Sequence, residues 1–367
     1  MAGTTVTFYG WGGDEKTNAW IDGFLTDVMK SKYDIKLKRV GMDIDQILNQ
    51  LLSEKQANLA KGNIDVIWIN GENFYTAKTS GLLYGPIAHR VDNYQKYIDG
   101  ANTENTTDFG VPTEGFEVPY GRAQLVMIKN SEVFPEPIRS ADQLMEFAKA
   151  KPGLITYPAP PDFTGSAFVR TILCDIVGYE EIKAAGADKA KLKAVLAPAL
   201  AYLKELKPYL WKAGTTYPAD VASLNNMYAD NEVALTVSYT PFFVVDAVAQ
   251  GFFTESSQVS VFDKGSVGNT HFVSLAYNSP NPEGGIALIN EILSVEAQAR
   301  KYVPAVWGDL SVLDFDKLSP EEQAQFKAVP TGDAAMTQEE LMNKRIPELP
   351  AEMIPIIEEI WMEEIPG

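Results

Sequence analysis

Two short segments of the chain place glycine beside polar and aromatic side chains at the ends of predicted strands. Residues 11–13, Trp-Gly-Gly, follow a strand expected over residues 4–9, and residues 70–74, Asn-Gly-Glu-Asn-Phe, follow one expected over residues 64–69. Glycine lets a ligand approach the backbone, and a helix that begins there offers free N–H groups. The candidate ligand-binding residues are Trp11, Gly12, Asn70, Glu72, Asn73 and Phe74. Ordinary turns with helix caps are the alternative explanation.

A third segment, residues 160–166, joins a strand expected over residues 154–157 to a helix that runs to about Val177. Its hydroxyl and backbone N–H groups can donate to an anionic group at the helix start, although a plain N-cap explains the same residues. The candidates here are Phe163, Thr164, Gly165 and Ser166. Arg170, one turn into the helix, is expected at the surface.

Residues 114–124 are polar for a strand that is expected to cross between two lobes. Side chains alternate along a strand, so Tyr120 and Arg122 should share one face. Arg122 is expected either to contact a solute or to pair with Glu117. The candidates from this strand are Glu117, Tyr120 and Arg122, and two later aromatic residues, Tyr239 and Trp307, complete the set.

Enzyme signatures are scarce in this sequence. Glu72 and Glu117 could meet as the acid/base pair of a glycosidase or transferase, but carboxylates are abundant in the chain and chance pairs are common. The motifs GxSxG, HExxH and CxxC and a P-loop do not occur. His89, His271 and Cys174 are the only histidines and cysteine, which leaves no cluster for zinc or copper. We therefore expect no catalytic residues, no metal and no cofactor.

The chain carries 49 Asp and Glu against 31 Lys and Arg, a formal charge of −18 at pH 7. This balance repels phosphate backbones, so no nucleic-acid partner is expected. No apolar run reaches the roughly 20 residues of a membrane helix, since the nearest, residues 239–253, is broken by Pro241 and Asp246. The first residues lead into a strand without a signal peptide, so the protein is cytoplasmic or its export leader is absent from this sequence.

The first third of the chain alternates strands, over residues 4–9, 35–40 and 64–69, with segments of helical apolar spacing. Right-handed crossovers make such a run a doubly wound, mostly parallel sheet. The expected fold class is α/β with two such lobes. The predicted domains are residues 1–117 with 263–310 for lobe I, 118–262 for lobe II, and 311–367 for a C-terminal helical segment that packs on the lobes. Because no flexible linker is present, paired strands near residues 118 and 263 should join the lobes.

Several segments of the sequence carry a family resemblance. They are WGG at residues 11–13, DVIWINGENF at 65–74, TDFG at 107–110, EGFEVPYGRAQ at 114–124, PAPPDFTGSAFVR at 158–170 and the SPNP turn at 279–282. In these segments, and over nearly its whole length, the chain resembles extracellular solute-binding proteins of ABC importers, of the family 1 type, and within them the YnjB-like branch. Tyr120 departs from the pattern, because tryptophan is common at that position.

The resemblance implies a type II periplasmic-binding-protein-like fold, in which two lobes joined by hinge strands close on a small solute in the cleft between them. It also implies export to the periplasm or cell surface, docking on a membrane permease, and transport without catalysis. We expect a monomer. Relatives take up thiamine, iron, polyamines or oxyanions, so the resemblance leaves the solute open.

Two classes of solute fit the candidate residues. A cationic heterocycle of thiamine type could stack on aromatic rings while Glu72 and Glu117 balance its charge. A phosphorylated or carboxylated anion could instead use Thr164, Ser166, Arg122 and the helix N-termini. The aromatic candidates are Trp11, Phe74, Tyr120, Phe163, Tyr239 and Trp307. An exported interaction module with a vestigial cleft is the remaining alternative.

Overall fold

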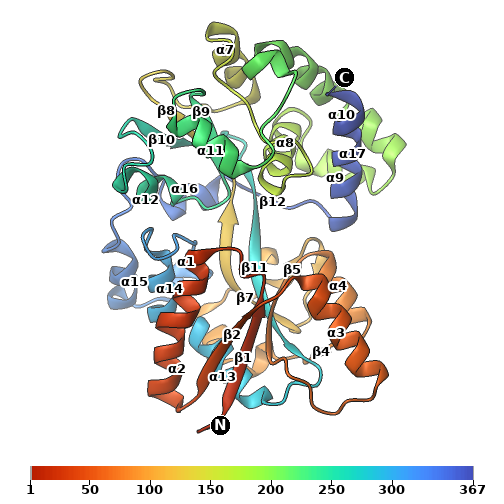
Figure 1. Ribbon diagram of the computed structural model, residues 1–367, viewed down its shortest axis with the longest axis vertical. Helices are drawn as coiled ribbons and strands as arrows, with labels where there is room; N and C mark the ends of the chain where they lie inside the picture. Colours follow the sequence, from red (N-terminus) through yellow and green to blue (C-terminus); the bar gives the residue numbers. More distant parts are fainter. Residues whose placement is uncertain (1, 367) are drawn as a thin grey trace. The chain divides into compact units, whose positions relative to one another are not determined.

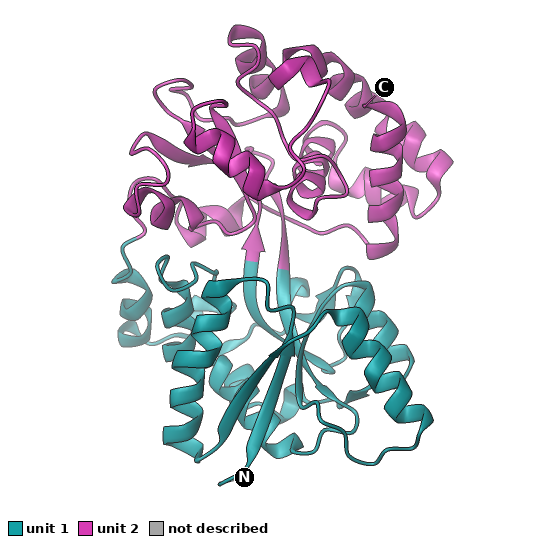
Figure 2. Ribbon diagram, in the orientation of Figure 1, with its two compact units in different colours: residues 1–122, 270–330 teal, residues 123–269, 331–367 magenta. Residues whose placement is uncertain are grey.

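The computed structural model describes residues 2–366, which form two compact units (Figure 2). Unit 1 contains residues 1–122 and 270–330, and unit 2 contains residues 123–269 and 331–367. Both units combine helices with strands, so the α/β class expected from the sequence is confirmed. No helix among the described residues is long and apolar enough to cross a membrane.

The chain passes between the units at three places. Two of them lie within strand β7 (Glu117–Gln124) and strand β11 (Ser266–Ala276), where the unit boundaries follow Arg122 and Asn269. Both crossings lie a few residues beyond the positions near 118 and 263 that are expected from the sequence. The third crossing follows Pro330, so the segment expected as one C-terminal piece is divided between the units.

Side-chain packing explains this division. Helix α15 (Pro320–Lys327) stays with unit 1 because Phe326 packs edge-on against Tyr302, with ring centroids 5.5 Å apart. Helix α17 (Ile354–Glu364) belongs to unit 2, where it packs on helix α10 (Lys189–Leu206).

The sheet of unit 1 has the order β11–β3–β1–β2 (Figure 1). Strands β1 (Thr5–Gly10), β2 (Lys36–Gly41) and β3 (Val66–Ile69) are parallel, as the alternation of strands and helices predicts. Strand β11 runs antiparallel to β3. The short strands of this unit are β4 (Leu83–Tyr84), β5 (Thr107–Asp108) and β6 (Val111–Pro112).

A long helical segment follows β1. It comprises α1 (Glu15–Ala19), a π-helical turn at Trp20–Leu25 and α2 (Thr26–Tyr33), and its apolar side chains recur at helical spacing on the buried side. The other helices of unit 1 are α3 (Ile44–Gln56), α4 (Glu72–Thr79), α5 (Asp92–Tyr97), α6 (Thr103–Thr106), α13 (Pro282–Ile292), α14 (Val295–Tyr302) and α15, with short 3-10 turns at Ala88–Arg90 and Phe315–Lys317.

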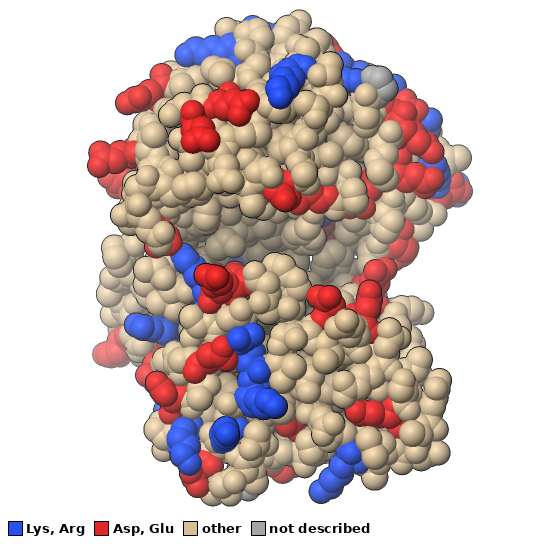
Figure 3. Space-filling view, in the orientation of Figure 1, with Lys and Arg blue, Asp and Glu red and all other residues tan. Residues whose placement is uncertain are grey.

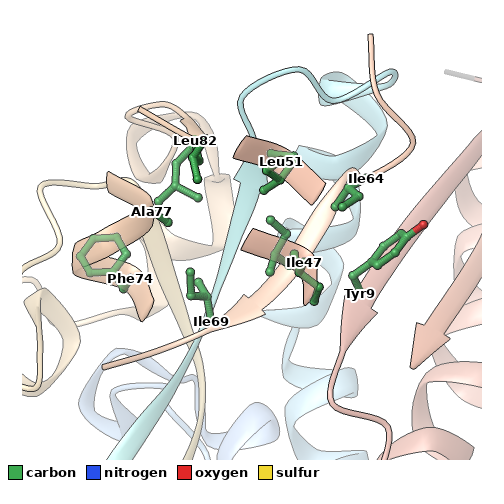
Figure 4. Close-up of a cluster of buried hydrophobic side chains, with 11 residues drawn as sticks. Tyr9, Ile47, Leu51, Ile64, Ile69, Phe74, Ala77 and Leu82 are labelled. Atoms are coloured by element: carbon green, nitrogen blue, oxygen red, sulfur yellow. The ribbon is translucent and has the colours of Figure 1, made fainter. Parts of the chain in front are cut away.

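A hydrophobic cluster joins helices α3 and α4 to the sheet of unit 1 (Figure 4). Ile47 and Leu51 of α3 meet Phe74 and Ala77 of α4, and all four are fully buried. Full burial of an Ile, Leu or Phe side chain contributes about 1.5–3 kcal/mol. The cluster therefore fixes α4 on the sheet, together with the loop that leads into it.

Unit 2 has a three-stranded sheet in the order β10–β8–β9. Strand β8 (Val126–Asn130) is antiparallel to both β9 (Leu235–Ser238) and β10 (Ser257–Ser260), which corrects the mostly parallel sheet expected for the second lobe. The cause is the path of the chain. Strand β8 leads away from the crossing in β7, whereas β9 returns towards it and ends with Ser238 opposite Val126.

Helix α8 (Phe163–Ile176) forms the centre of unit 2. Its side chains from Thr164 to Asp175 are buried, which is the pattern of an interior helix. Burial raises the pKa of the Cys174 thiol within it to about 12, so this thiol is an unreactive core group. The remaining elements of unit 2 are α7 (Ala141–Ala150), α9 (Tyr179–Ala185), α11 (Val221–Ala229), α12 (Phe243–Ala249), α16 (Gln338–Asn343), strand β12 (Arg345–Pro347) and 3-10 turns at Lys207–Tyr209, Trp211–Gly214 and Ala351–Met353.

Aromatic packing anchors helix α17 on unit 2. Trp361 is 2% exposed, donates from Nε1 to the hydroxyl of Tyr157 at 3.2 Å, and lies edge-on to Tyr217 at 5.3 Å. Ion pairs such as Lys189–Glu363, at 2.7 Å, lie at the surface, where they contribute little to stability. The indole therefore anchors the helix together with the buried side chains of Ile357 and Ile360.

Replacing Trp361 by alanine is expected to lower the free energy of unfolding by about 3–5 kcal/mol, because deletion of a packed indole leaves a cavity. Denaturant-induced unfolding followed by circular dichroism measures this change. Met362→Ala changes a neighbouring side chain that is 47% exposed and should change stability by less than about 0.5 kcal/mol. Equal destabilisation by both variants would contradict this role of Trp361.

Candidate functional site

Trp11 lies exposed directly after strand β1. Its side chain is 61% exposed, and the indole folds back over Gly13, where a Cβ atom would come within 2.2 Å of the ring. Gly12 has a φ of +76°, and a Cβ there would lie 2.9 Å from the Cα of Gly41 at the end of β2. Both glycines are therefore needed, one beneath the ring and one where the two strand ends approach each other.

Asp14 completes this loop and caps helix α1. Its carboxylate accepts hydrogen bonds from the backbone N–H groups of Lys16 at 2.8 Å and Thr17 at 3.2 Å, which a helix start otherwise leaves without partners. The residues lining a small pocket here include Trp11, Gly12, Asp14, Asn18, Arg39 and Trp68. An exposed aromatic ring and a carboxylate therefore adjoin the same pocket.

The second loop of unit 1 leads from β3 into α4. Gly71 donates its backbone N–H to the carboxyl group of Asp108 at 2.5 Å, which holds the loop in place. Asn70 and Asn73 are half-buried and Glu72 is exposed, and Glu72 and Asn73 line a groove between α3 and α4. These three polar candidates are thus at least partly open to solvent.

Phe74 lies in the first turn of α4, and its side chain is buried. It is fully buried and extends into the hydrophobic cluster with Ile69 and Ala77 (Figure 4). One face of an amphipathic helix must pack on the core, and Phe74 and Ala77, three residues apart, share that face of α4. The structure therefore corrects the expectation that Phe74 stacks on a solute.

Glu117, at the start of β7, is enclosed by unit 1. It is 1% exposed, and neither of its carboxyl oxygens has a hydrogen-bond partner among residues 2–366. Burial, and then the neighbouring Asp108, raise the pKa of Glu117 well above its usual range. Burial raises the pKa of Asp108 to about 8, although the hydrogen bond from Gly71 opposes this shift. Asp108 is therefore mostly protonated at pH 7. Burial likewise disfavours the charged form of Glu117, and its enclosure keeps it from a solute, contrary to expectation.

Arg122 projects from the opposite side of β7 to Glu117, because an odd spacing along a strand places side chains on opposite faces. It is 6% exposed and donates to Asn105 Oδ1 at 2.6 Å. Its backbone exchanges hydrogen bonds with Leu310, at 3.2 and 3.1 Å. The alternative in which Arg122 pairs with Glu117 is not formed, and its burial also removes it from contact with solvent.

Tyr120 and Trp307 pack on other rings of unit 1. Tyr120 is 1% exposed and lies 5.9 Å from Trp68 and 6.1 Å from Trp307 between ring centroids. Trp307 is 6% exposed and stacks on His271 at 6.3 Å, with an interplanar angle of 14°. Both were expected as stacking partners for a solute, but the protein's own aromatic side chains occupy their faces.

In unit 2, the loop into helix α8 exposes one aromatic ring. Phe163 is 51% exposed and contacts Tyr239 edge-on, with centroids 4.9 Å apart. Asp162 caps the helix by accepting a hydrogen bond from the N–H of Gly165 at 2.7 Å. A Cβ at Gly165 would come within 2.0 Å of the carbonyl oxygen of Pro158, so only glycine lets the helix approach this loop. Phe163 and Tyr239 form the accessible aromatic surface of the loop.

The hydroxyl groups expected as free donors in this loop are buried, with Thr164 7% and Ser166 2% exposed. Ser166 donates to Glu358 at 2.6 Å and accepts a hydrogen bond from Arg170. Arg170 is itself buried rather than at the surface, because its guanidinium group pairs with both carboxylate oxygens of Glu348, at 3.0 and 3.2 Å. The Ser166 hydroxyl and the Arg170 guanidinium group are therefore committed to acceptors within the protein.

The candidate residues thus fall into two groups. The accessible or partly accessible ones are Trp11, Gly12, Asn70, Glu72 and Asn73 of unit 1 and Phe163 and Tyr239 of unit 2. The buried ones are Phe74, Glu117, Tyr120, Arg122, Thr164, Gly165, Ser166 and Trp307. Sequence reasoning missed Asp14, Trp68 and Glu348. Asp14 had a usable signal, since an aspartate just before a helical segment is an N-cap signal.

The sequence of the chain is similar to those of known proteins. A family model described as bacterial extracellular solute-binding protein matches residues 25–321. The chain is also similar to protein YnjB of Escherichia coli (strain K12), with 38% identity over 325 residues, which are 88% of this chain and 83% of that protein.

Two solved structures extend the comparison to the fold. The Tp0655 (TpPotD) lipoprotein of Treponema pallidum is similar with a TM-score of 0.68 and 14% identity over 98% of both chains. An ABC transporter from Clostridium perfringens ATCC 13124 is similar with a TM-score of 0.64 and 16% identity, over 98% of this chain and 99% of that one. The expected fold of type II periplasmic binding proteins is thereby confirmed.

Because the carboxyl group of Asp108 is buried, we expect the free energy of unfolding to fall as pH rises. Its pKa in the folded protein is about 8, against 3.8 for an ordinary aspartate. The folded state therefore retains a proton that the unfolded chain releases, and this stabilisation, complete below pH 4, is lost as pH approaches 8. The free energy of unfolding should fall by up to about 1.4 kcal/mol per pH unit between pH 5 and 8.

Asp108→Asn removes this titration. The slope of the free energy of unfolding against pH should therefore decrease by up to about 1.4 kcal/mol per pH unit, as measured by urea unfolding at pH 5, 6, 7 and 8. Asp45→Asn, which changes an exposed carboxylate at the start of α3, is the matched control and should keep the wild-type slope. Parallel profiles for the wild type and Asp108→Asn would refute a protonated Asp108.

Proposed function

Because this chain belongs to the family of bacterial extracellular solute-binding proteins, we propose that it is the substrate-binding component of an ABC importer and that its solute is a small heteroaromatic cation of thiamine type. The observation that carries the choice of solute is the pairing of an exposed ring with a carboxylate in each unit. Trp11 adjoins Asp14 in unit 1, and Phe163 directly follows Asp162 in unit 2. Aromatic faces attract cations and stack on planar rings.

The cations and N–H groups near these loops are already paired, which supports the choice of a cation. The guanidinium group of Arg39, beside Trp11, donates to Asp22 at 2.9 and 2.7 Å. Asp14 already accepts the N–H groups at the start of α1, and Asp162 accepts one at the start of α8. Ser166 and Arg170 are hydrogen-bonded to the carboxylates of Glu358 and Glu348. A phosphorylated or carboxylated solute would have to displace these groups.

A cleft enzyme that uses Glu72 and Glu117 finds less support. An acid/base pair must reach the substrate from both sides, whereas Glu117 is enclosed by protein and Glu72 is exposed on α4. We propose a receptor without catalysis that is exported, acts as a monomer and delivers its solute to a membrane permease. Acidic and basic side chains are interspersed on the face shown in Figure 3. The excess of 49 Asp and Glu over 31 Lys and Arg in the whole sequence supports a partner other than nucleic acid.

Calorimetry with thiamine, spermidine and inorganic phosphate tests the class of solute. Thiamine is expected to bind most tightly, spermidine more weakly because it lacks a ring, and phosphate not at all. Mass spectrometry of the natively purified protein should reveal a bound organic cation that incubation leaves unchanged. Tight phosphate binding, or chemical turnover of the bound compound, would contradict the proposal.

The exposed rings should provide most of the stacking energy. Trp11→Ala and Phe163→Ala are each expected to weaken thiamine binding about tenfold, which corresponds to about 1.4 kcal/mol and lies within the range for ring–cation contacts. Tyr75→Ala removes a ring that is 54% exposed on α4 and serves as the control, with unchanged affinity. Glu72→Gln should weaken thiamine binding, and phosphate should still fail to bind. A uniform loss across all four variants would refute this assignment.

A further inference from the structure

Glu348 is a buried carboxylate in unit 2 that comes from the C-terminal part of the chain, just after strand β12. It is 6% exposed and receives two hydrogen bonds from the guanidinium group of Arg170, at 3.0 and 3.2 Å. The hydroxyl of Tyr239 donates to its Oε1 at 2.8 Å. Glu348 thus lies directly behind the ring that supports the exposed Phe163.

These partners form the kind of donor set that binds a free anion. A forked guanidinium group and a hydroxyl converging on two oxygens are typical of carboxylate and phosphate sites. A second guanidinium group, that of Arg345, is close enough to Tyr239 to act on its pKa, and it donates to the carbonyl oxygens of Ala123 and Asn269, both at 2.7 Å. The side chain of Glu348 therefore occupies the place that an anionic ligand would take.

We propose that Glu348 determines the sign of charge that unit 2 accepts. It cancels the charge of Arg170 and holds the Tyr239 hydroxyl, which leaves the Phe163–Tyr239 surface without a net positive charge and suited to a cationic ring. Without this carboxylate, the guanidinium group of Arg170 would lie behind the same surface with its charge no longer cancelled by Glu348, and it would attract an anion. The inference rests on the proposed function only in taking Phe163 and Tyr239 as solute contacts. Glu348 is a positioning residue, since it acts through Arg170 and Tyr239.

Glu348→Gln is the direct test, because it keeps the size of the side chain and removes its charge. Calorimetry should show at least a tenfold loss of thiamine affinity and the appearance of inorganic phosphate binding that weakens as salt is raised from 50 to 300 mM. Glu352→Gln changes an exposed carboxylate in the same segment and should match the wild type. A folded Glu348→Gln protein that still binds no phosphate would overturn the proposal.

The double variant Arg170→Gln/Glu348→Gln separates charge from folding, because it leaves no unpaired buried charge. It should keep thiamine affinity within about threefold of the wild type and gain no phosphate binding. Phosphate binding by the double variant, or a tenfold loss of thiamine affinity, would overturn the role of Glu348 even if the single variant did not fold. If the wild type binds no thiamine, the proposed function fails, while gain of phosphate binding by Glu348→Gln still supports the inference.

Discussion

The first turn of a helix leaves backbone N–H groups without partners, and this constraint governs both loops that expose an aromatic ring. Asp14 accepts two of these groups at the start of α1, and Asp162 accepts one at the start of α8. A carboxylate cap keeps a negative charge at the position where many proteins receive a phosphate. Each cap therefore stabilises its helix and at the same time makes the adjoining loop a poor site for anions.

In the interior of unit 2, a carboxylate likewise compensates a buried charge. Arg170 is buried in helix α8, where an unpaired guanidinium group would be strongly unfavourable, so a carboxylate must accompany it. Glu348 meets this need and also fixes Tyr239, the ring on which Phe163 rests. The C-terminal part of the chain is thus structurally necessary for the exposed aromatic surface, although it contributes no exposed residue to it.

Local patterns in the sequence were sufficient to predict the parallel strands of unit 1, the helices that follow them and the exposed rings of Trp11 and Phe163. They were not sufficient to assign faces. Phe74 directly follows the polar residues Glu72 and Asn73, yet the rotation of α4 places it in the core. The two alternatives for Arg122, contact with a solute or a pair with Glu117, could not be separated from the sequence, and the structure shows Arg122 donating to Asn105 instead. Glu348 could not be found, because only the folded chain brings it to Arg170 across 178 positions.

Strand β7 shows why polarity alone is a weak guide to a binding site. All of its residues are buried, because it runs from one unit into the other and is covered within both. Two of its polar side chains make internal hydrogen bonds: Arg122 donates to Asn105, and Gln124 donates to the backbone carbonyl oxygens of Leu341 and Lys344. The carboxyl group of Glu117 makes none among residues 2–366, and burial disfavours its charged form instead. Buried polar groups need such partners. The hydrogen bonds of these polar residues therefore anchor the strand in each unit. Contact with a solute has to be inferred from exposed side chains instead.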